Sequence, residues 1–381
     1  MYLQSERIWI DETFQPAILR IDDSKIRNIL PYGSVEPVVD YGTDCVYPGF
    51  IDIHSHGYLG ANANAITAEG LLRWVKDLPA EGVTSFLFST STAPVDQLLS
   101  SMQVYLDIKK GKPDGADMLG IHMEGPFLSH EFRGAHTPEW LLKPSVEAFK
   151  PFLALCHDEL KMIAIAVEMD EDLALSKFCL EQGIKVAIGH SAATLEDVRK
   201  ARAIGVNDFT HTYNAMLGLH HREPGTVGAA MRFDDMYAEV IADGVHVHFD
   251  AVNILGVRKG KDKLITVTDA VSIKGLAPGV HIFADRTVTI DEKGCGHLED
   301  GRLAGSSNHM NDLLRNLVGP CELPWDTSVN SMTKNPATFL DIADYKGSLA
   351  IGYDADITIL NDDFKVVATY VKGKLAFKEP Q

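Results

Sequence analysis

Six side chains of the types that bind divalent metal ions each stand at the end of a short apolar run of the chain. They are His54, His56, Glu124, His190, His211 and Asp269. Imidazole nitrogens and carboxylate oxygens are ligands that zinc and similar ions prefer, and a bound divalent ion activates water for hydrolysis. A single His in such a place is more often a loop residue, so the prediction of a metal centre rests on the whole set.

The local spacing of these residues suits that chemistry. His54 and His56 are two positions apart, which puts both imidazoles on one side of an extended segment. Glu124 precedes a Gly-Pro turn, where its carboxylate could bridge two cations. Asp269 could accept the proton of a metal-bound water and return it to a leaving nitrogen. The alternatives are a polar strand end for the His pair, a turn cap for Glu124 and a helix cap for Asp269.

His190 and His211 also have a simpler interpretation. Ser191 could cap a helix that starts after His190, and both imidazoles would then be spectators. Neutral imidazole is nevertheless the commonest zinc ligand, and both residues follow apolar runs as the other four do.

Eight strand-like runs precede or carry these side chains. They cover residues 49–53, 84–89, 118–122, 161–167, 185–188, 208–211, 237–242 and 264–267. Amphipathic helical stretches lie between several of them, for example 68–78 and 194–204, the second with Thr194 as its N-cap. This alternation predicts a TIM (β/α)8 barrel, in which all strands end at one catalytic face. Only a ring of strands would bring all six side chains to one point.

Both ends of the chain show a different pattern, with strand-like runs in place of alternating strands and helices. Residues 1–48 contain strand-like runs at 7–10, 17–21 and 25–29 and no clear helix, and strands are also predicted at 287–290, 356–359, 366–370 and 374–377. Helical stretches at 308–318 and 333–340 would complete the ring. We therefore predict a barrel over residues 49–342 and one small β-sandwich formed by residues 1–48 and 343–381.

Composition restricts the kinds of partner. The 381 residues include 53 acidic and 35 basic ones, and the formal charge of −18 disfavours nucleic acids and anionic membranes. No apolar run approaches the ~20 residues of a membrane span, and the start MYLQSERIWIDE is not a signal peptide, so we expect a cytoplasmic protein. Five cysteines without a C-x-x-C pair are expected to be reduced packing residues.

Seven segments in a fixed order carry a family resemblance. The segments PGFIDIHSHG, GIHMEGPF, GHSAAT, THTYNAM, REPG, ADGVHV and VTDA, from about residue 47 to 310, resemble the N-acetylglucosamine-6-phosphate deacetylases of the amidohydrolase superfamily. LAGSS near residue 303 and GSLAIGYDADITIL near the C-terminus are similar to the same family. The resemblance implies a homodimer that removes the acetyl group of N-acetylglucosamine-6-phosphate in amino sugar metabolism.

The resemblance also implies roles for individual residues. Glu124, His190 and His211 match metal ligands, and Asp269 matches the catalytic acid and base. Because His54 and His56 are present, one or two ions per subunit are expected, with Glu124 as the bridge. Zinc is the first expectation, and iron, manganese and cobalt are alternatives. No Lys ends the fourth strand, so a carbamylated Lys is not expected.

Substrate contacts are implied at further positions. His136 matches a residue near the reacting amide, His246 matches a phosphate contact, and Arg222 matches an Arg that reaches the phosphate across the dimer interface. The remaining predicted contacts are Ala135, Asn214, Ala215, Asp243, Leu303, Ala304 and Gly305. Arg222 could instead be a solvated loop charge beside Glu223.

Two other functions stay open at this point. One is hydrolysis of another N-acyl substrate, such as N-acetylgalactosamine-6-phosphate or an N-acyl amino acid. The other is a non-catalytic sugar-phosphate-binding barrel. Asp269 argues against the second, because binding alone needs no proton shuttle.

Overall fold

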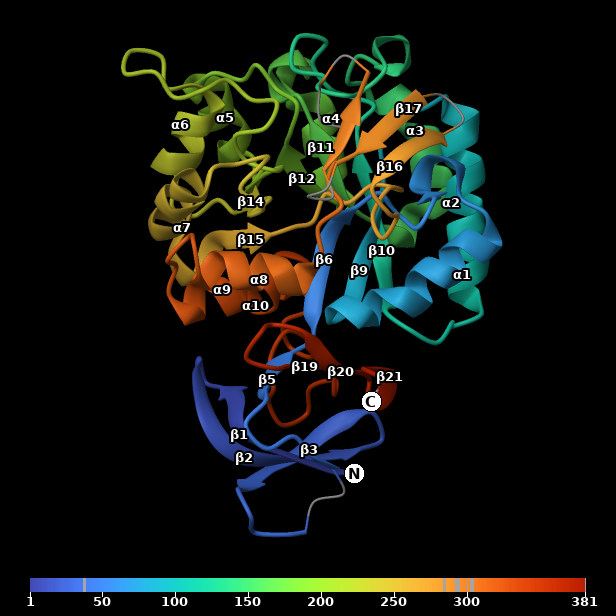
Figure 1. Ribbon diagram of the computed structural model, residues 1–381. Helices are drawn as coiled ribbons and strands as arrows, with labels where there is room; N and C mark the ends of the chain where they lie inside the picture. Colours follow the sequence, from blue (N-terminus) through green and yellow to red (C-terminus); the bar gives the residue numbers. More distant parts are fainter. Residues whose placement is uncertain (37–38, 284–285, 292–294, 300, 302–304, 381) are drawn as a thin grey trace.

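The structure, a computed structural model, describes residues 1–36, 39–283, 286–291, 295–299, 301 and 305–380. Figure 1 shows a large body of strands and helices above a smaller β module that holds both chain ends. The predicted division at residues 48 and 342 stays a prediction, since Trp9 and Tyr47 pack into the same core cluster as the barrel helices.

Eight parallel strands form the ring that carries the predicted site. They are β6 (Phe50–Ser55), β9 (Val83–Thr90), β10 (Asp117–Glu124), β11 (Leu160–Ile165), β12 (Lys185–Ile188), β13 (Asp208–Phe209), β14 (Ala238–Val240) and β15 (Leu264–Thr266). The first six form one parallel sheet, and β14 and β15 form a parallel pair. The eight strands predicted from the sequence are confirmed.

Backbone hydrogen bonds close this ring at both junctions. Tyr237 N donates to Asn207 O and Thr212 N to Glu239 O, which joins β13 to β14. Asp269 N donates to His54 O, which joins the end of β15 to β6. The last strand therefore lies beside the first, as a closed barrel requires.

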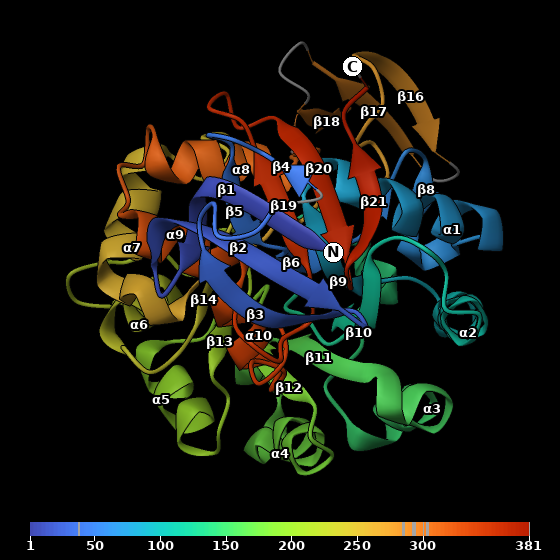
Figure 2. The ribbon, with the colours of Figure 1, turned by 90° about the horizontal axis from the view of Figure 1, so that it is seen from below.

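Helices surround the ring (Figure 2). They are α1 (Ala68–Asp77), α2 (Val95–Lys110), α3 (Val146–Cys156), α4 (Ala174–Glu181), α5 (Leu195–Ala203), α6 (Gly225–Arg232), α7 (Phe249–Lys263), α8 (Met310–Val318), α9 (Trp325–Met332) and α10 (Lys334–Phe339). Thr194 caps α5, and its side chain and that of Asp197 form a capping box, so the predicted N-cap is confirmed. The predicted segment 333–340 corresponds to α10.

The two ends of the chain share one β module. Its strands are β1 (Tyr2–Ile10), β2 (Thr13–Asp22), β3 (Lys25–Pro31), β4 (Val39–Asp40), β5 (Cys45–Pro48), β19 (Ile357–Leu360), β20 (Val366–Val371) and β21 (Lys374–Lys378). They form one mixed sheet in which β5 pairs with both β1 and β19. Leu3 and Leu19 share a core with Ile357 and Ala368. The expected module built from both ends is confirmed.

A small antiparallel sheet between β15 and α8 was predicted only in part. It comprises β16 (Gly279–Phe283), β17 (Arg286–Ile290) and β18 (Gly296–Leu298), of which only the run 287–290 was expected. A hairpin of β7 (Gly57–Tyr58) and β8 (Ala61–Asn62) follows β6. β7, β8 and β18 have only two or three residues each, which is too short for the alternation that makes a strand visible in a sequence.

The cysteines and the helices bear on two expectations from composition. All five cysteines carry a thiol rather than a disulfide, and four of them are buried. Within the described ranges, no helix combines the length and the apolar character that crossing a membrane requires.

Candidate metal centre

The six predicted ligand side chains converge at the C-terminal face of the ring. His54 lies on β6 and Glu124 ends β10, whereas His190, His211 and Asp269 lie two or three residues beyond β12, β13 and β15. His190, His211 and Asp269 have positive φ values of 47°, 30° and 48°. Such values are unusual for residues other than Gly and are common at functional sites. The predicted convergence is therefore present in the fold.

One cluster contains Glu124, His190 and His211. Oε1 of Glu124 lies 3.1 Å from Nε2 of His190 and 2.9 Å from Nε2 of His211, and these two nitrogens are 3.1 Å apart. All three residues are buried.

The second cluster contains His54, His56 and Asp269. Nε2 of His54 and Nε2 of His56 are 3.0 Å apart, and Oδ1 of Asp269 lies 3.2 Å from Nε2 of His56. Oε2 of Glu124 lies 3.3 Å from the same His56 nitrogen. Glu124 thus lies between the two clusters, with one oxygen directed to each.

The donor atoms fit divalent metal ions. In each cluster, three His or carboxylate atoms lie within 4.8 Å of one another. The opposite ring nitrogens of two histidines are also held: Nδ1 of His56 lies 2.9 Å from Ser89 O, and Nδ1 of His190 lies 2.9 Å from Phe132 O. A carbonyl only accepts, so each Nδ1 carries the proton and each Nε2 presents a lone pair, the arrangement of metal-binding histidines.

Electrostatics favour a neutral imidazole at His190. Burial, helped by the charge of His136, lowers the pKa of His190 to about 4. A neutral imidazole is the form that coordinates a cation, so at neutral pH this residue needs no deprotonation to act as a ligand.

Glu239 on β14 was not predicted as part of the site. It is fully buried, and its Oε2 lies 2.9 Å from Nδ1 of His54 and accepts from the backbone N–H of His211 at 3.1 Å. Burial and the charge of Glu239 hold the pKa of the neighbouring Asp208 well above its usual range. A Glu inside the apolar run Tyr237–Ala242 is the signal that could have revealed it.

His136, predicted to lie near the reacting amide, is beside the first cluster. Its Nε2 is 3.4 Å from Oε2 of Glu124, and its Nδ1 is 2.9 Å from Oγ1 of Thr92. The loop before it packs closely on His190: Gly134 has a φ of 56°, and a Cβ there would lie 3.1 Å from Cε1 of His190. The predicted contact Ala135 follows in the same loop and is partly exposed.

The predicted sugar-phosphate residues lie on neighbouring loops. Nδ1 of His246 is 2.6 Å from Oδ2 of Asp243, which also accepts from Nδ2 of Asn308 at 2.8 Å. Nδ2 of Asn214 donates to His211 O at 3.4 Å, and the next residue is Ala215 with a φ of 51°. Gly305 has a φ of 86°, whereas the predicted contacts Leu303 and Ala304 lie outside the described residues. Asn308 was not predicted.

Arg222 does not reach the cluster within its own chain. It lies exposed in the loop before α6, where its Nη1 is 3.1 Å from Nε2 of His221 and its backbone N–H donates to Nδ1 of His220. This position is compatible with a contact to another subunit and also with a solvated loop charge.

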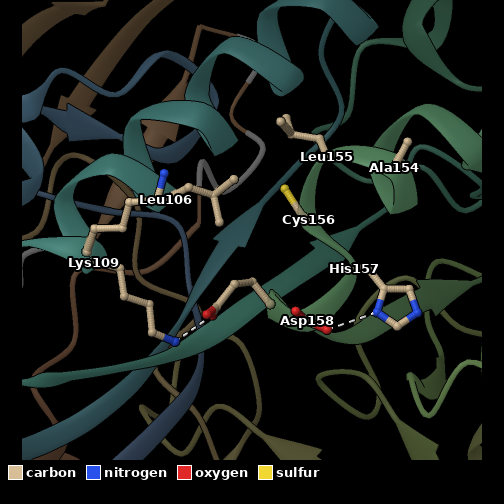
Figure 3. Close-up of a pocket in the computed structure, with 9 residues that line it drawn as sticks. Leu106, Lys109, Ala154, Leu155, Cys156, His157 and Asp158 are labelled. Atoms are coloured by element: carbon tan, nitrogen blue, oxygen red, sulfur yellow. Dashed lines mark hydrogen bonds and ion pairs between the residues drawn. The ribbon is translucent and has the colours of Figure 1, made fainter.

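A cavity of about 480 Å³ lies elsewhere, between α2 and the end of α3 (Figure 3). The charged side chains that line it are paired: Lys109 with Glu159, His157 with Asp158, and Lys110 with Asp107. None of the predicted site residues lines it, so it provides no support for a second active site.

Comparison with known proteins gives consistent matches over nearly the whole chain. Residues 45–376 match the amidohydrolase family. The chain is 36% identical over 377 residues to the N-acetylglucosamine-6-phosphate deacetylase of Bacillus subtilis, covering 96% of this chain and 94% of that protein. It is 30% identical to the N-acetylgalactosamine-6-phosphate deacetylase of Escherichia coli O157:H7, covering 98% and 97%.

A solved structure is similar as well. The crystal structure of N-acetyl-D-glucosamine-6-phosphate deacetylase from Mycobacterium smegmatis aligns with a TM-score of 0.93 at 28% identity, over 99% of this chain and all of that one.

Proposed function

We infer the reaction from the fact that the chain belongs to the amidohydrolase family and, within it, to the N-acetylglucosamine-6-phosphate deacetylases. The reaction is hydrolysis of the N-acetyl group of N-acetylglucosamine-6-phosphate, which gives acetate and glucosamine-6-phosphate. The observation that carries it is the convergence of two ligand clusters on Glu124 with Asp269 beside them. A carboxylate next to the ligands provides the proton transfer that amide hydrolysis needs.

Divalent metal ions are proposed at both clusters. Glu124, His190 and His211 would hold one ion, and His54, His56 and Asp269 would hold a second, with Glu124 between them. When bound, such an ion polarises a carbonyl oxygen and makes a bound water more acidic. The nitrogen and oxygen donors suit zinc first, and iron, manganese and cobalt are alternatives.

Asp269 is proposed as the proton carrier. Its carboxylate takes a proton from the attacking water, whose oxygen forms a bond to the acetamide carbon. When the carbon–nitrogen bond breaks, Asp269 returns that proton to the amine nitrogen, and acetate is released. His136, whose Nε2 faces Oε2 of Glu124, is placed to donate to the acetamide oxygen.

The sugar phosphate is proposed to lie toward His246. The contact of its Nδ1 with Asp243 directs Nε2 away from that carboxylate, and when both ring nitrogens are protonated Nε2–H can donate to a phosphate oxygen. Ala135, Asn214, Ala215, Leu303, Ala304 and Gly305 are the proposed neighbours of the sugar. A phosphorylated sugar does not cross a membrane unaided because of its charge, so we place the reaction in the cytoplasm.

A homodimer is proposed to complete the phosphate site with Arg222 of a second subunit. Arg222 lies in an exposed loop, and large apolar side chains are exposed close to it in sequence and on α7: Leu219 is 60% exposed, Ile254 60% and Val257 68%. Figure 1 shows this loop and α7 on the same side of the barrel as α6. Exposed apolar groups of this kind are typical of a subunit interface, and an Arg pairs bidentately with a phosphate.

Substrate preference tests the function. Initial rates of acetate release are measured with N-acetylglucosamine-6-phosphate, its galactose epimer and unphosphorylated N-acetylglucosamine. The expected order of kcat/KM places the phosphorylated glucose form first and the unphosphorylated sugar last. A preference for the galactose epimer, which the name of the Escherichia coli relative gives as its substrate, would instead assign N-acetylgalactosamine-6-phosphate deacetylation to this chain.

A further inference from the structure

One carboxylate oxygen behind the ligands contacts both clusters. Oε2 of Glu239 lies 2.9 Å from Nδ1 of His54, a residue of the second cluster, and accepts from the backbone N–H of His211, a residue of the first. Glu239 is fully buried on β14, a strand that carries none of the six predicted ligands. A buried carboxylate is costly unless it is hydrogen-bonded, so these two contacts account for its place in the barrel.

The contact with His54 decides which ring nitrogen faces the cluster. Glu239 accepts from Nδ1–H, and Nε2 of His54 then presents its lone pair where it lies 3.0 Å from Nε2 of His56. The other two histidines held through Nδ1 rely on backbone carbonyls, Ser89 O for His56 and Phe132 O for His190. Among these three, only the orientation of His54 depends on a charged side chain, and a carboxylate raises the basicity of an imidazole more than a carbonyl does.

The contact with His211 acts on the backbone. His211 has a φ of 30°, in the left-handed region that residues other than Gly rarely adopt. Its buried N–H needs an acceptor there, and Glu239 provides it. This conformation directs Nε2 of His211 to Oε1 of Glu124 at 2.9 Å.

We propose that Glu239 is a positioning residue that fixes the ring of His54 and links the two metal subsites, so that the second ion binds well only when its carboxylate is present. This inference rests on the proposed function, because it assigns an action toward ions held by the two clusters. It predicts that Glu239 controls the second ion more than the first. Two of the residues that would hold the first ion, His190 and Glu124, do not contact Glu239.

Metal titration of three purified proteins tests the proposal. The wild type, Glu239→Leu and Glu239→Gln are stripped with chelator, dialysed against buffered zinc and analysed for bound metal per subunit. Leu offers no acceptor to Nδ1 of His54, and the affinity for the second ion is expected to fall roughly 10- to 100-fold. Gln keeps the size and one acceptor oxygen but not the charge, so its loss is expected to be smaller than that of Leu.

A matched control separates positioning from general stability. Asp170 is another buried carboxylate, which accepts from Leu175 N and Ser176 N at the start of α4 and touches no ligand. Asp170→Asn is expected to lower the Tm and leave the metal content at two ions. Far-UV circular dichroism of the metal-free proteins checks folding, and if Glu239→Leu does not fold, the affinity of Glu239→Gln decides.

The possible results are distinguishable. Two ions bound with wild-type affinity in the folded Glu239 variants would overturn the positioning role while leaving the deacetylase reaction intact. A wild type that binds no metal and releases no acetate would instead overturn the proposed function. Selective loss of the second ion in both variants, with the first retained, supports the inference.

Discussion

Oδ1 of Asp269 lies 3.2 Å from Nε2 of His56, so the end of the eighth barrel strand meets the end of the first at the candidate metal centre. In the metal-free protein, the pKa values of His54 and His56 are raised and both rings are protonated. Burial raises the pKa of the Asp269 carboxyl, but the charge of His54 and the hydrogen bond from His56 then outweigh it and hold that pKa below its usual range. Asp269 is therefore a carboxylate at neutral pH, which is the form that a proton acceptor requires.

Asp269→Asn is expected to abolish most of the activity without removing the first ion. An amide of the same size cannot accept the proton of the attacking water, and loss of general base catalysis lowers kcat by about 10²- to 10⁴-fold. Acetate release and bound metal per subunit are measured on the same preparation. A kcat within tenfold of the wild-type value, with metal present, would exclude Asp269 as the proton carrier.

Arg222→Ala is expected to raise KM for the phosphorylated sugar more than it lowers kcat. If Arg222 holds the phosphate of a neighbouring active site, its interaction is remote from the reacting amide and contributes mainly to binding. The matched control is Arg199→Ala, which removes a surface Arg paired with Glu196 on α5. Unchanged KM and kcat in Arg222→Ala would identify it as a solvated loop charge.

Chelation is expected to lower the Tm of the protein. An ion that binds only the folded chain stabilises it by about 2.7 kcal/mol at a free concentration 100 times the Kd, which for a chain of this size corresponds to a Tm shift of roughly 3 °C per ion. Thermal melts are recorded with and without a chelator and after addition of zinc. A Tm that the chelator leaves unchanged would speak against metal ions bound at the two clusters.

The buried pair of Glu81 and Lys274 predicts a loss of stability in acid. Oε1 of Glu81 lies 2.6 Å from Nζ of Lys274, and although burial raises the pKa of Glu81, the charge of Lys274 lowers it further, to about 2 from its ordinary 4.5. Because the folded pKa is depressed, the stabilisation is complete above about pH 4.5 and is lost as the pH falls toward 2. It amounts to about 3 kcal/mol.

Urea unfolding between pH 7 and pH 3 checks this linkage. The wild type is expected to be more stable than Glu81→Gln at pH 7, and the difference should shrink below pH 4.5. A difference that stays constant over this range would mean that Glu81 titrates alike in the folded and unfolded chains.

The barrel and the convergence of the six candidate ligands could be predicted because both follow from local rules. Apolar runs ending in His54, Glu124 and Asp269 mark strands whose carboxyl ends must meet in a ring. Glu239 could not be placed in this way, because its role depends on which strands become neighbours: β14 brings it behind His54 and His211, which are 185 and 28 positions away in the sequence. Asn308 was missed for the same reason, since only the fold brings it to Asp243.

The most direct test of the account is acetate release from N-acetylglucosamine-6-phosphate before and after metal removal. The purified chain is assayed as isolated, after dialysis against chelator, and after return of zinc or manganese. The account predicts strong turnover at first, loss of nearly all of it on chelation, and recovery with metal. Turnover that persists in demonstrably metal-free protein would contradict the metal-dependent reaction, and no turnover in any state would contradict the deacetylase activity itself.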